Sequence, residues 1–250
     1  TLLYILILTP ALSTSLAANS AVIVVYHRFG DNRHPLTNIT IEQFDAHIAL
    51  LSSETYNVLP IDEILLRQRS GKKLPDRTVG ITIDDAFSSV YHEAWPRLRD
   101  AELPFTLFVS TDPIDRGYKD MMSWEQIREM AQAGVIIGAH TGSHLHMNAH
   151  SSKYVNNELT RSNVRFQNEL GKIPTLFAYP YGESSLANEK IVKRAGYKAA
   201  FGQHSGAFTS QDNQFNLPRF PMNEKYGDMG RFKTAINALA IPIKDLTPRD

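Results

Sequence analysis

The chain has 250 residues, of which 42% are hydrophobic and 21% charged, and lysine plus arginine equal aspartate plus glutamate at 26 each. The zero net charge gives no electrostatic basis for binding nucleic acid, because such proteins usually present a basic face. Cysteine is absent, which excludes disulfides, thiolate metal ligands and a cysteine nucleophile. The length suits one sizeable domain and would also allow two small ones.

The N-terminus is apolar over residues 2–8, is interrupted by Pro10, and continues to a small-residue stretch at 15–17 that resembles a cleavage site. This pattern is typical of the later part of a secretory signal peptide. We expect residues 1–18 to be a signal-peptide remnant and residues 19–250 a single domain that is secreted or periplasmic. An uncleaved anchor or a buried first strand are the alternatives, but a stable membrane span needs roughly 20 apolar residues.

Short apolar runs alternate with amphipathic stretches from residue 20 onward. The predicted strands cover residues 21–27, 57–60, 78–83, 105–110, 135–139, 175–179, 199–202 and 217–220. Several of these runs are continuously apolar, as is typical of parallel strands that are buried on both faces. The alternation predicts an α/β fold, a (β/α) barrel of seven or eight parallel strands, complete or distorted.

Helix boundaries are also marked in the sequence. Thr40 with Gln43, and Ser123 with Gln126, fit the capping-box pattern, in which two side chains satisfy the first free backbone donors of a helix. Glycines stand where helices should stop, and residues 152–170 read as one long helix. The glycines in question are Gly71, Gly134, Gly171 and Gly196.

Two carboxylates, Asp84 and Asp85, close the apolar run 78–83. One aspartate at such a place could cap a following helix, which we expect over residues 86–100. The second aspartate then needs another explanation. Because active sites of parallel α/β barrels form where the strands end, chemistry is the other interpretation.

Two histidines, His140 and His144, follow the apolar run 135–139. Either one could be an ordinary surface or core histidine, and the nearby His146 and His150 increase the chance of a fortuitous pair. Two imidazoles and one carboxylate, however, are a usual ligand set for catalytic zinc. The other carboxylate is then free to act as a base toward the attacking water.

Three motifs, in this order along the chain, resemble those of the polysaccharide deacetylases with a NodB-type domain. They are Thr82-Ile83-Asp84-Asp85, His140-Thr141-Gly142-Ser143-His144 and Ala178-Tyr179-Pro180-Tyr181. The resemblance covers roughly residues 20–220. It implies a metal-dependent hydrolase that removes N-acetyl groups from a polysaccharide.

The resemblance also implies roles for individual residues. Asp84 is the expected general base. Asp85, His140 and His144 are the expected metal ligands, with zinc the expected ion and nickel or cobalt able to substitute. The backbone N–H of Tyr181 is the expected donor to the oxyanion.

The chain departs from the family pattern at two places. The family arginine of the third motif is replaced by Ala178, and Arg219 is either its substitute or an ordinary surface charge. The usual late motif with the acid histidine is absent, whereas His27 follows the first predicted strand. This arrangement resembles the branch that deacetylates poly-N-acetylglucosamine, in which His27 would be the general acid; a capping or core histidine is the alternative.

The expected substrate is an N-acetylglucosamine polysaccharide, with an exopolysaccharide favoured over peptidoglycan or chitin. We expect neither a nucleic-acid partner nor a stable membrane span. A catalytically inactive carbohydrate-binding relative is the alternative, which the missing arginine favours and the retained Asp84, Asp85, His140 and His144 oppose.

On position alone, Tyr181 and Phe87 suit a sugar ring better than Trp124, which we expect in the core. His204 either lines the cleft or is an ordinary loop residue.

Overall fold

The computed structural model describes residues 19–238. The expected signal-peptide remnant, residues 1–18, therefore lies outside the described residues. The strands are β1 (Ala21–Tyr26), β2 (Arg28–Phe29), β3 (Asn38–Ile39), β4 (Asn57–Val58), β5 (Thr78–Asp84), β6 (Thr106–Val109), β7 (Ile136–Ala139), β8 (Leu176–Ala178), β9 (Ala199–Phe201), β10 (Ala207–Phe208) and β11 (Phe220–Pro221).

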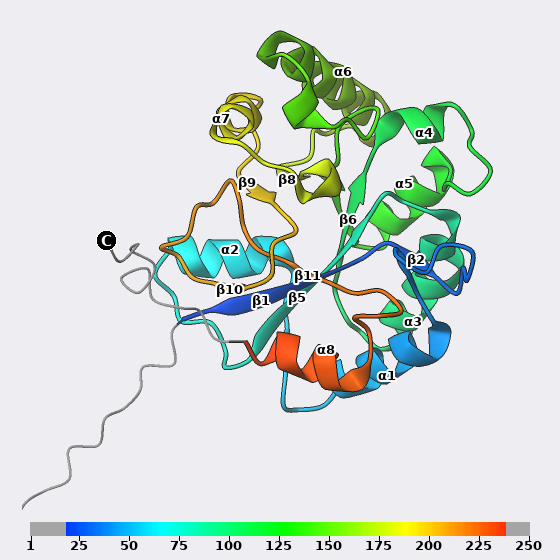
Figure 1. Cartoon of the computed structure of the whole chain (residues 1–250), viewed down its shortest axis with the longest axis vertical. Coiled ribbons are helices and arrows are strands. Elements are labelled where there is room, and N and C mark those ends of the chain that lie inside the picture. The colour runs from blue at the N-terminus through cyan, green and yellow to red at the C-terminus, as the bar shows by residue number, and fades with distance from the viewer. Residues whose placement is uncertain (1–18, 239–250) are drawn as a thin grey trace, which may run out of the picture.

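Helices connect most of these strands (Figure 1). The α-helices are α1 (Ile41–Leu51), α2 (Ile61–Arg69), α3 (Trp95–Asp100), α4 (Thr111–Asp115), α5 (Trp124–Gln132), α6 (Ser152–Leu170), α7 (Leu186–Arg194) and α8 (Met229–Ile236). A π-helix, η1 (Val90–Ala94), precedes α3, and two 3₁₀ turns are η2 (Met147–Ala149) and η3 (Pro180–Gly182). Both predicted capping boxes are present, at the start of α1 and of α5.

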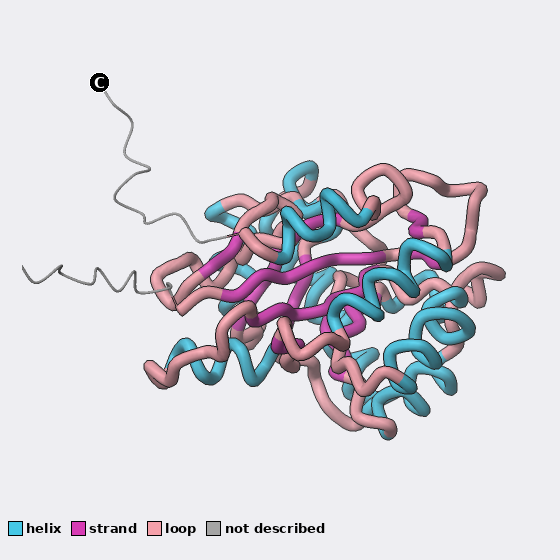
Figure 2. Tube along the Cα trace, turned by 90° about the horizontal axis from the view of Figure 1, so that it is seen from below, coloured by secondary structure: helices cyan, strands magenta, loops and turns pink. Residues whose placement is uncertain are grey.

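The main sheet has nine strands in the order β10-β1-β5-β6-β7-β8-β9, with β4 also paired to β5 and β11 to β1. All its pairs are parallel except β1 with β10. The two ends of the sheet approach each other, because Leu217 bridges Phe201 of β9 while Phe220 pairs with Val24 of β1. The expected α/β architecture is confirmed as a curled, mostly parallel half-barrel, with helices on both sides of the strands (Figure 2).

Each face of the sheet has its own hydrophobic cluster. The first contains Val24 of β1 and Ile81 of β5, with Phe44 of α1, Leu159 of α6 and Phe232 of α8. The second contains residues of α2 packed on the opposite face. Here α2 approaches so closely that a Cβ at position 80 would lie 2.5 Å from Ile61 Cδ1, which explains the glycine in β5. Burial on both faces accounts for the continuously apolar strands.

Two predicted elements differ from the structure. The expected helix over residues 86–100 begins only at Val90, since Asp85 and Ala86 have positive φ angles. It changes from π to α beside Pro96, which has no N–H to donate to the preceding turn. The expected strand 217–220 reduces to one bridge at Leu217 and the two residues of β11. Pro218 lacks a ladder donor there.

Candidate active site

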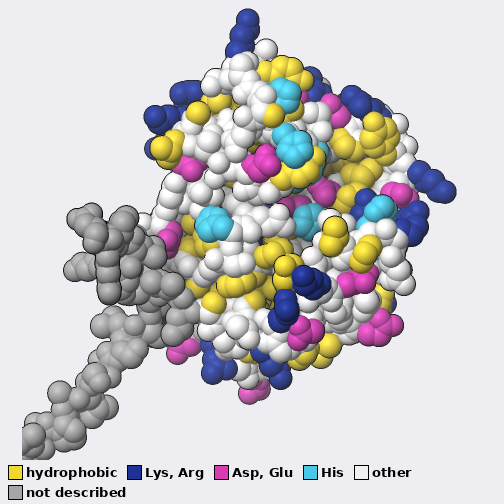
Figure 3. Space-filling view, viewed as in Figure 1, with side chains coloured by type: hydrophobic (Ala, Val, Ile, Leu, Met, Phe, Trp, Pro, Cys, Tyr) yellow, Lys and Arg dark blue, Asp and Glu magenta, His cyan; other side chains and the backbone are white. Residues whose placement is uncertain are grey.

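The six predicted catalytic and metal-binding residues line one pocket of about 270 Å³. They come from the carboxyl ends of four strands: His27 after β1, Asp84 and Asp85 at the end of β5, His140 and His144 after β7, and Tyr181 after β8. Parallel strands place these ends at one edge of the sheet. Several histidine side chains are exposed on the face shown in Figure 3.

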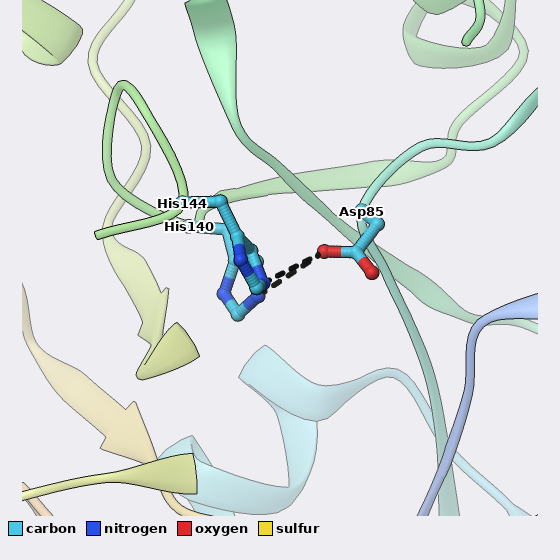
Figure 4. A group of neighbouring side chains, drawn as sticks. All are labelled: Asp85, His140 and His144. Atoms are coloured by element: carbon cyan, nitrogen blue, oxygen red, sulfur yellow. Dashed lines mark ion pairs between the residues drawn. The ribbon is translucent and has the colours of Figure 1, made fainter. Parts of the chain in front are cut away.

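Asp85, His140 and His144 form the candidate metal site (Figure 4). One ligand atom from each lies within 4.8 Å of the others. The Nε2 atoms of His140 and His144 are 3.5 Å and 3.2 Å from Asp85 Oδ1. Two imidazoles and a carboxylate are a donor set that suits a divalent transition metal.

The hydrogen bond of His140 orients the ring toward this cluster. Its Nδ1 lies 2.8 Å from the carbonyl oxygen of Ala178, and because a carbonyl only accepts, Nδ1 carries the proton. Nε2 is then left with a lone pair that faces Asp85. Burial lowers the pKa of His140 to about 4, against the opposing effect of Asp84 and Asp85, so the ring is neutral near pH 7. A neutral ring of this tautomer is what a metal requires.

Asp85 has a buried side-chain oxygen without a hydrogen-bond donor among the described residues. Its Oδ1 is buried and makes no hydrogen bond within the described residues, although such atoms are normally satisfied. Burial raises the pKa of this carboxyl, but His144, His140 and His27 lower it, and the net pKa lies below the usual value. The unsatisfied, ionised oxygen therefore fits a cation held between the three side chains.

The backbone around the pocket adopts the left-handed region. Non-glycine residues at positive φ include Asp85 (77°), Thr141 (64°), His144 (58°) and Tyr181 (59°). Such conformations cost free energy of order 1 kcal/mol or more each and tend to cluster at functional sites. Together with Ala86, they account for five of the seven such residues in the part of the chain that the structure describes. Asp85 and His144 thus stand in backbone conformations that non-glycine residues rarely adopt.

Arg219 is fully buried and pairs with Asp84. Its Nη1 and Nη2 each donate to one carboxylate oxygen of Asp84 at 2.8 Å, while Nε donates to the Gly202 carbonyl at 2.9 Å. Arg219 therefore lies where an arginine can hold Asp84, and the interpretation as a surface charge is wrong. Burial raises the pKa of Asp84, but Arg219 and His140 lower it, and the net pKa lies below the usual value.

A group of polar residues from α6 and α4 holds the loop that carries His144. Buried Glu158 accepts from the backbone N–H of Ser143 and, at 2.7 Å, from its hydroxyl. Arg161 donates to Glu158 and to Asp112. A Cβ at Gly142 would lie 2.7 Å from the same guanidinium, which would have to shift to admit a side chain there. Sequence reasoning missed these residues, although a carboxylate on the apolar face of α6 was a usable signal.

The remaining candidates are placed as follows. Tyr181 packs between two imidazoles, with its ring centroid 4.5 Å from that of His144 and 3.6 Å from that of His146. Phe87 has the Arg28 guanidinium 3.4 Å over its ring, so one face is already covered. Trp124 is buried, as expected. Gln203, and not its neighbour His204, is a lining residue of the pocket.

Neither aspartate caps a helix. Asp84 ends β5 and Ser89 occupies the N-cap position of η1. His27 lies in the pocket near both carboxylates. The alternative of helix capping by the aspartates is therefore wrong. His140 and His144, for which an ordinary surface or core position was the alternative, lie together with Asp85.

The chain is similar to known proteins over most of its length. The family model of polysaccharide deacetylases matches residues 71–200, just over half of the chain. A Bacillus subtilis (strain 168) protein, YxkH, whose name as a polysaccharide deacetylase is provisional, is 28% identical over 197 residues, covering 79% of this chain and 69% of its own. The poly-beta-1,6-N-acetyl-D-glucosamine N-deacetylase of Staphylococcus aureus (strain MSSA476) is 26% identical, covering 82% and 80%. The chain belongs to the polysaccharide deacetylase family.

Solved structures show the same fold. The Streptococcus pyogenes deacetylase PplD, in complex with acetate, matches with a TM-score of 0.79 at 20% identity, covering 87% of this chain and 98% of that one. IcaB from Ammonifex degensii matches with a TM-score of 0.77 at 24% identity, covering 88% and 97%.

Proposed function

We propose that this chain is a metal-dependent N-deacetylase of an exopolysaccharide built from N-acetylglucosamine. The observation that carries the proposal is the unsatisfied Asp85 Oδ1 facing two imidazoles, in the same pocket as the arginine-paired Asp84. The Staphylococcus aureus relative, whose name states the poly-β-1,6-linked substrate, supports the choice of polymer.

Asp85, His140 and His144 would hold the metal, with zinc as the proposed ion. When bound, such an ion polarises the acetamide carbonyl and makes a water molecule more acidic. The amide needs this help because its carbonyl is a poor electrophile and its nitrogen a poor leaving group.

Asp84 would accept the proton of the attacking water. Its two oxygens are held by Arg219, and each carboxylate oxygen has a second lone pair that can still accept. The buried guanidinium keeps the carboxylate ionised and fixes its direction. Arg219 thereby positions Asp84, which is the role that the family motif gives to an arginine at the position of Ala178.

Tyr181 and His27 would complete the reaction. The backbone N–H of Tyr181 donates to no other backbone group in the described part of the chain and would donate to the developing oxyanion. His27 would protonate the departing nitrogen, since an imidazole that carries a proton can act as a general acid. The proposed roles thus divide among residues from four strand ends of the same pocket.

The inactive carbohydrate-binding alternative rested on the missing arginine. Since Arg219 is paired with Asp84, that observation no longer favours it. We further propose one domain over residues 19–250 and export from the cytoplasm, because N-acetylated polymers are abundant outside the cell. Among residues 19–238, none of the helices is both long and apolar enough to span a membrane.

The test of this function is acetate release from three substrates at equal N-acetyl concentration: β-1,6-linked N-acetylglucosamine oligomers, chitooligosaccharides and peptidoglycan. We expect metal-dependent release that is fastest from the β-1,6-linked oligomers. Preference for either other polymer would contradict the exopolysaccharide assignment. Absence of release from all three would contradict the proposed deacetylase activity.

The role of His27 has its own test. His27→Ala should lower turnover of acetamides more than turnover of activated acetyl esters, because the ester leaving group needs little protonation. Equal loss on both substrates would show that His27 is structural.

A further inference from the structure

A second depression adjoins the catalytic pocket. We define it as the β11–α8 groove, with a volume of about 660 Å³ between β11 and α8. Its principal lining residues are Phe220, Pro221, Met222, Tyr226, Arg231 and Thr234. In Figure 3, hydrophobic side chains lie below the histidines near the centre of the displayed face, around the position of β11 in Figure 1.

The groove and the catalytic pocket are neighbours that share lining residues. Pro221 and Met222 line both of them. Asn223 also lines the catalytic pocket, and its Oδ1 accepts from the backbone N–H of Tyr226, at 2.9 Å, on the wall of the groove. One short turn therefore connects the two sites and holds Tyr226 at a fixed distance from the catalytic residues.

The chemistry of the groove suits an uncharged ring with one apolar face. Phe220, Pro221 and Met222 give it an apolar lining. Tyr226 is an aromatic side chain that is 41% exposed, with the Lys225 ammonium 5.6 Å from its ring centroid. Arg231 lies 5.3 Å from the Tyr226 ring centroid and can donate to hydroxyl oxygens. The charge of Arg231 is balanced by Asp228 at 3.4 Å.

The catalytic pocket is too small to hold several sugar residues of a polymer. At about 270 Å³ it lies below the usual range of ~300–1,000 Å³ for pockets that hold drug-sized ligands. A polymer whose acetamide enters this pocket must continue along the surface. The β11–α8 groove is the adjoining depression that shares its wall.

We infer that the β11–α8 groove binds the sugar residues adjacent to the one that is deacetylated, with Tyr226 as the stacking surface. This inference rests on the proposed function. It makes chain length a determinant of affinity: a longer oligomer fills the groove, whereas a short one gains less from it.

The test compares a dimer with a pentamer of β-1,6-linked N-acetylglucosamine. Tyr226→Ala should raise KM for the pentamer about tenfold relative to KM for the dimer, with kcat for the pentamer nearly unchanged, because one aromatic contact is lost. Tyr226→Phe, which keeps the ring, should retain the ratio of the unmodified protein. Tyr118→Ala is the matched control, since Tyr118 is 52% exposed and lines neither depression.

Calorimetric binding separates this inference from the proposed function. Pentamer binding to Asp84→Asn needs no turnover, and adding Tyr226→Ala should weaken it about tenfold. An equal effect on dimer and pentamer, or no effect on either, would overturn the inference. Absence of acetate release with chain-length-dependent binding intact would overturn the catalytic proposal and leave the groove standing.

Discussion

His140 and His47 are both buried histidines, but their hydrogen bonds differ. Burial lowers the pKa of each to about 4. In His47, on α1, both ring nitrogens have partners: Nδ1 accepts from the Tyr26 hydroxyl at 2.9 Å, and Nε2 donates to the Gly227 carbonyl at 2.8 Å. In His140, only Nδ1 is used, and Nε2 faces the unsatisfied Asp85 Oδ1.

This difference shows which property separates a functional histidine from a structural one. Burial and a low pKa are common to both side chains. The distinguishing property is a nitrogen lone pair that points at a second unsatisfied ligand atom. His47 instead stacks on Phe232 at 3.5 Å and links α1, β1 and the turn before α8.

The largest expected effect comes from removing His140, the histidine of the candidate metal site. His140→Ala should abolish stoichiometric metal binding and lower acetate release by about a thousandfold or more, since the metal supplies several kcal/mol of transition-state stabilisation. Metal content after dialysis and kcat/KM are the measurements. Retention of full metal occupancy in a double His140/His144→Ala variant would show that the ion binds elsewhere.

The next effect separates ligation from proton transfer. Asp84→Asn should keep the metal but lower kcat by about 10²–10⁴-fold, because the amide cannot accept the proton. Metal analysis and acetate release are measured on the same preparation. A variant that loses its metal would instead make Asp84 a ligand.

A smaller effect tests whether the His144 loop must be held. Glu158→Gln should weaken metal affinity by about 10- to 100-fold, the range typical of groups that orient ligands. Glu169→Gln is the control on the same helix, because Glu169 pairs with Arg165 and makes no bond to the loop. Competition with a chelator measures both, and equal affinities would limit Glu158 to a structural role.

The smallest expected effect on activity concerns His47. His47→Ala should leave kcat within about threefold but lower the free energy of unfolding by about 2–4 kcal/mol, from lost hydrogen bonds and a cavity. Chemical denaturation and acetate release measure the two quantities. A loss of activity as large as that of His140→Ala would remove the distinction between the two histidines.

The lowered pKa of His47 also predicts that the free energy of unfolding depends on pH. The pKa of His47 is about 4 in the folded protein and about 6.5 when unfolded. Between these values the unfolded chain binds the proton and the folded chain does not, so the stability from this group is complete above pH ~6.5 and falls as the pH drops toward 4. The decline should be shallower in His47→Ala.

Much of the site could be predicted from sequence because it lies in local patterns. Apolar runs followed by Asp84–Asp85 and by His140 indicated strand ends, and parallel strand ends meet at one edge of a sheet. The two capping boxes likewise involve residues only three apart. By contrast, β10 depends on pairing with the distant strand β1, and the late start of η1 follows from unusual φ angles at Asp85 and Ala86. No local pattern indicated either of them.

The sequence by itself therefore determined the family, the strand–helix alternation and six of the residues that line the pocket, since each is encoded within a few neighbouring positions. Only the tertiary structure decided that Arg219 pairs with Asp84, 135 positions away, and that Glu158 holds the His144 loop. It also decided which histidine retains a free lone pair. These are questions of which distant groups satisfy one another, and the answer exists only once the chain has closed around them.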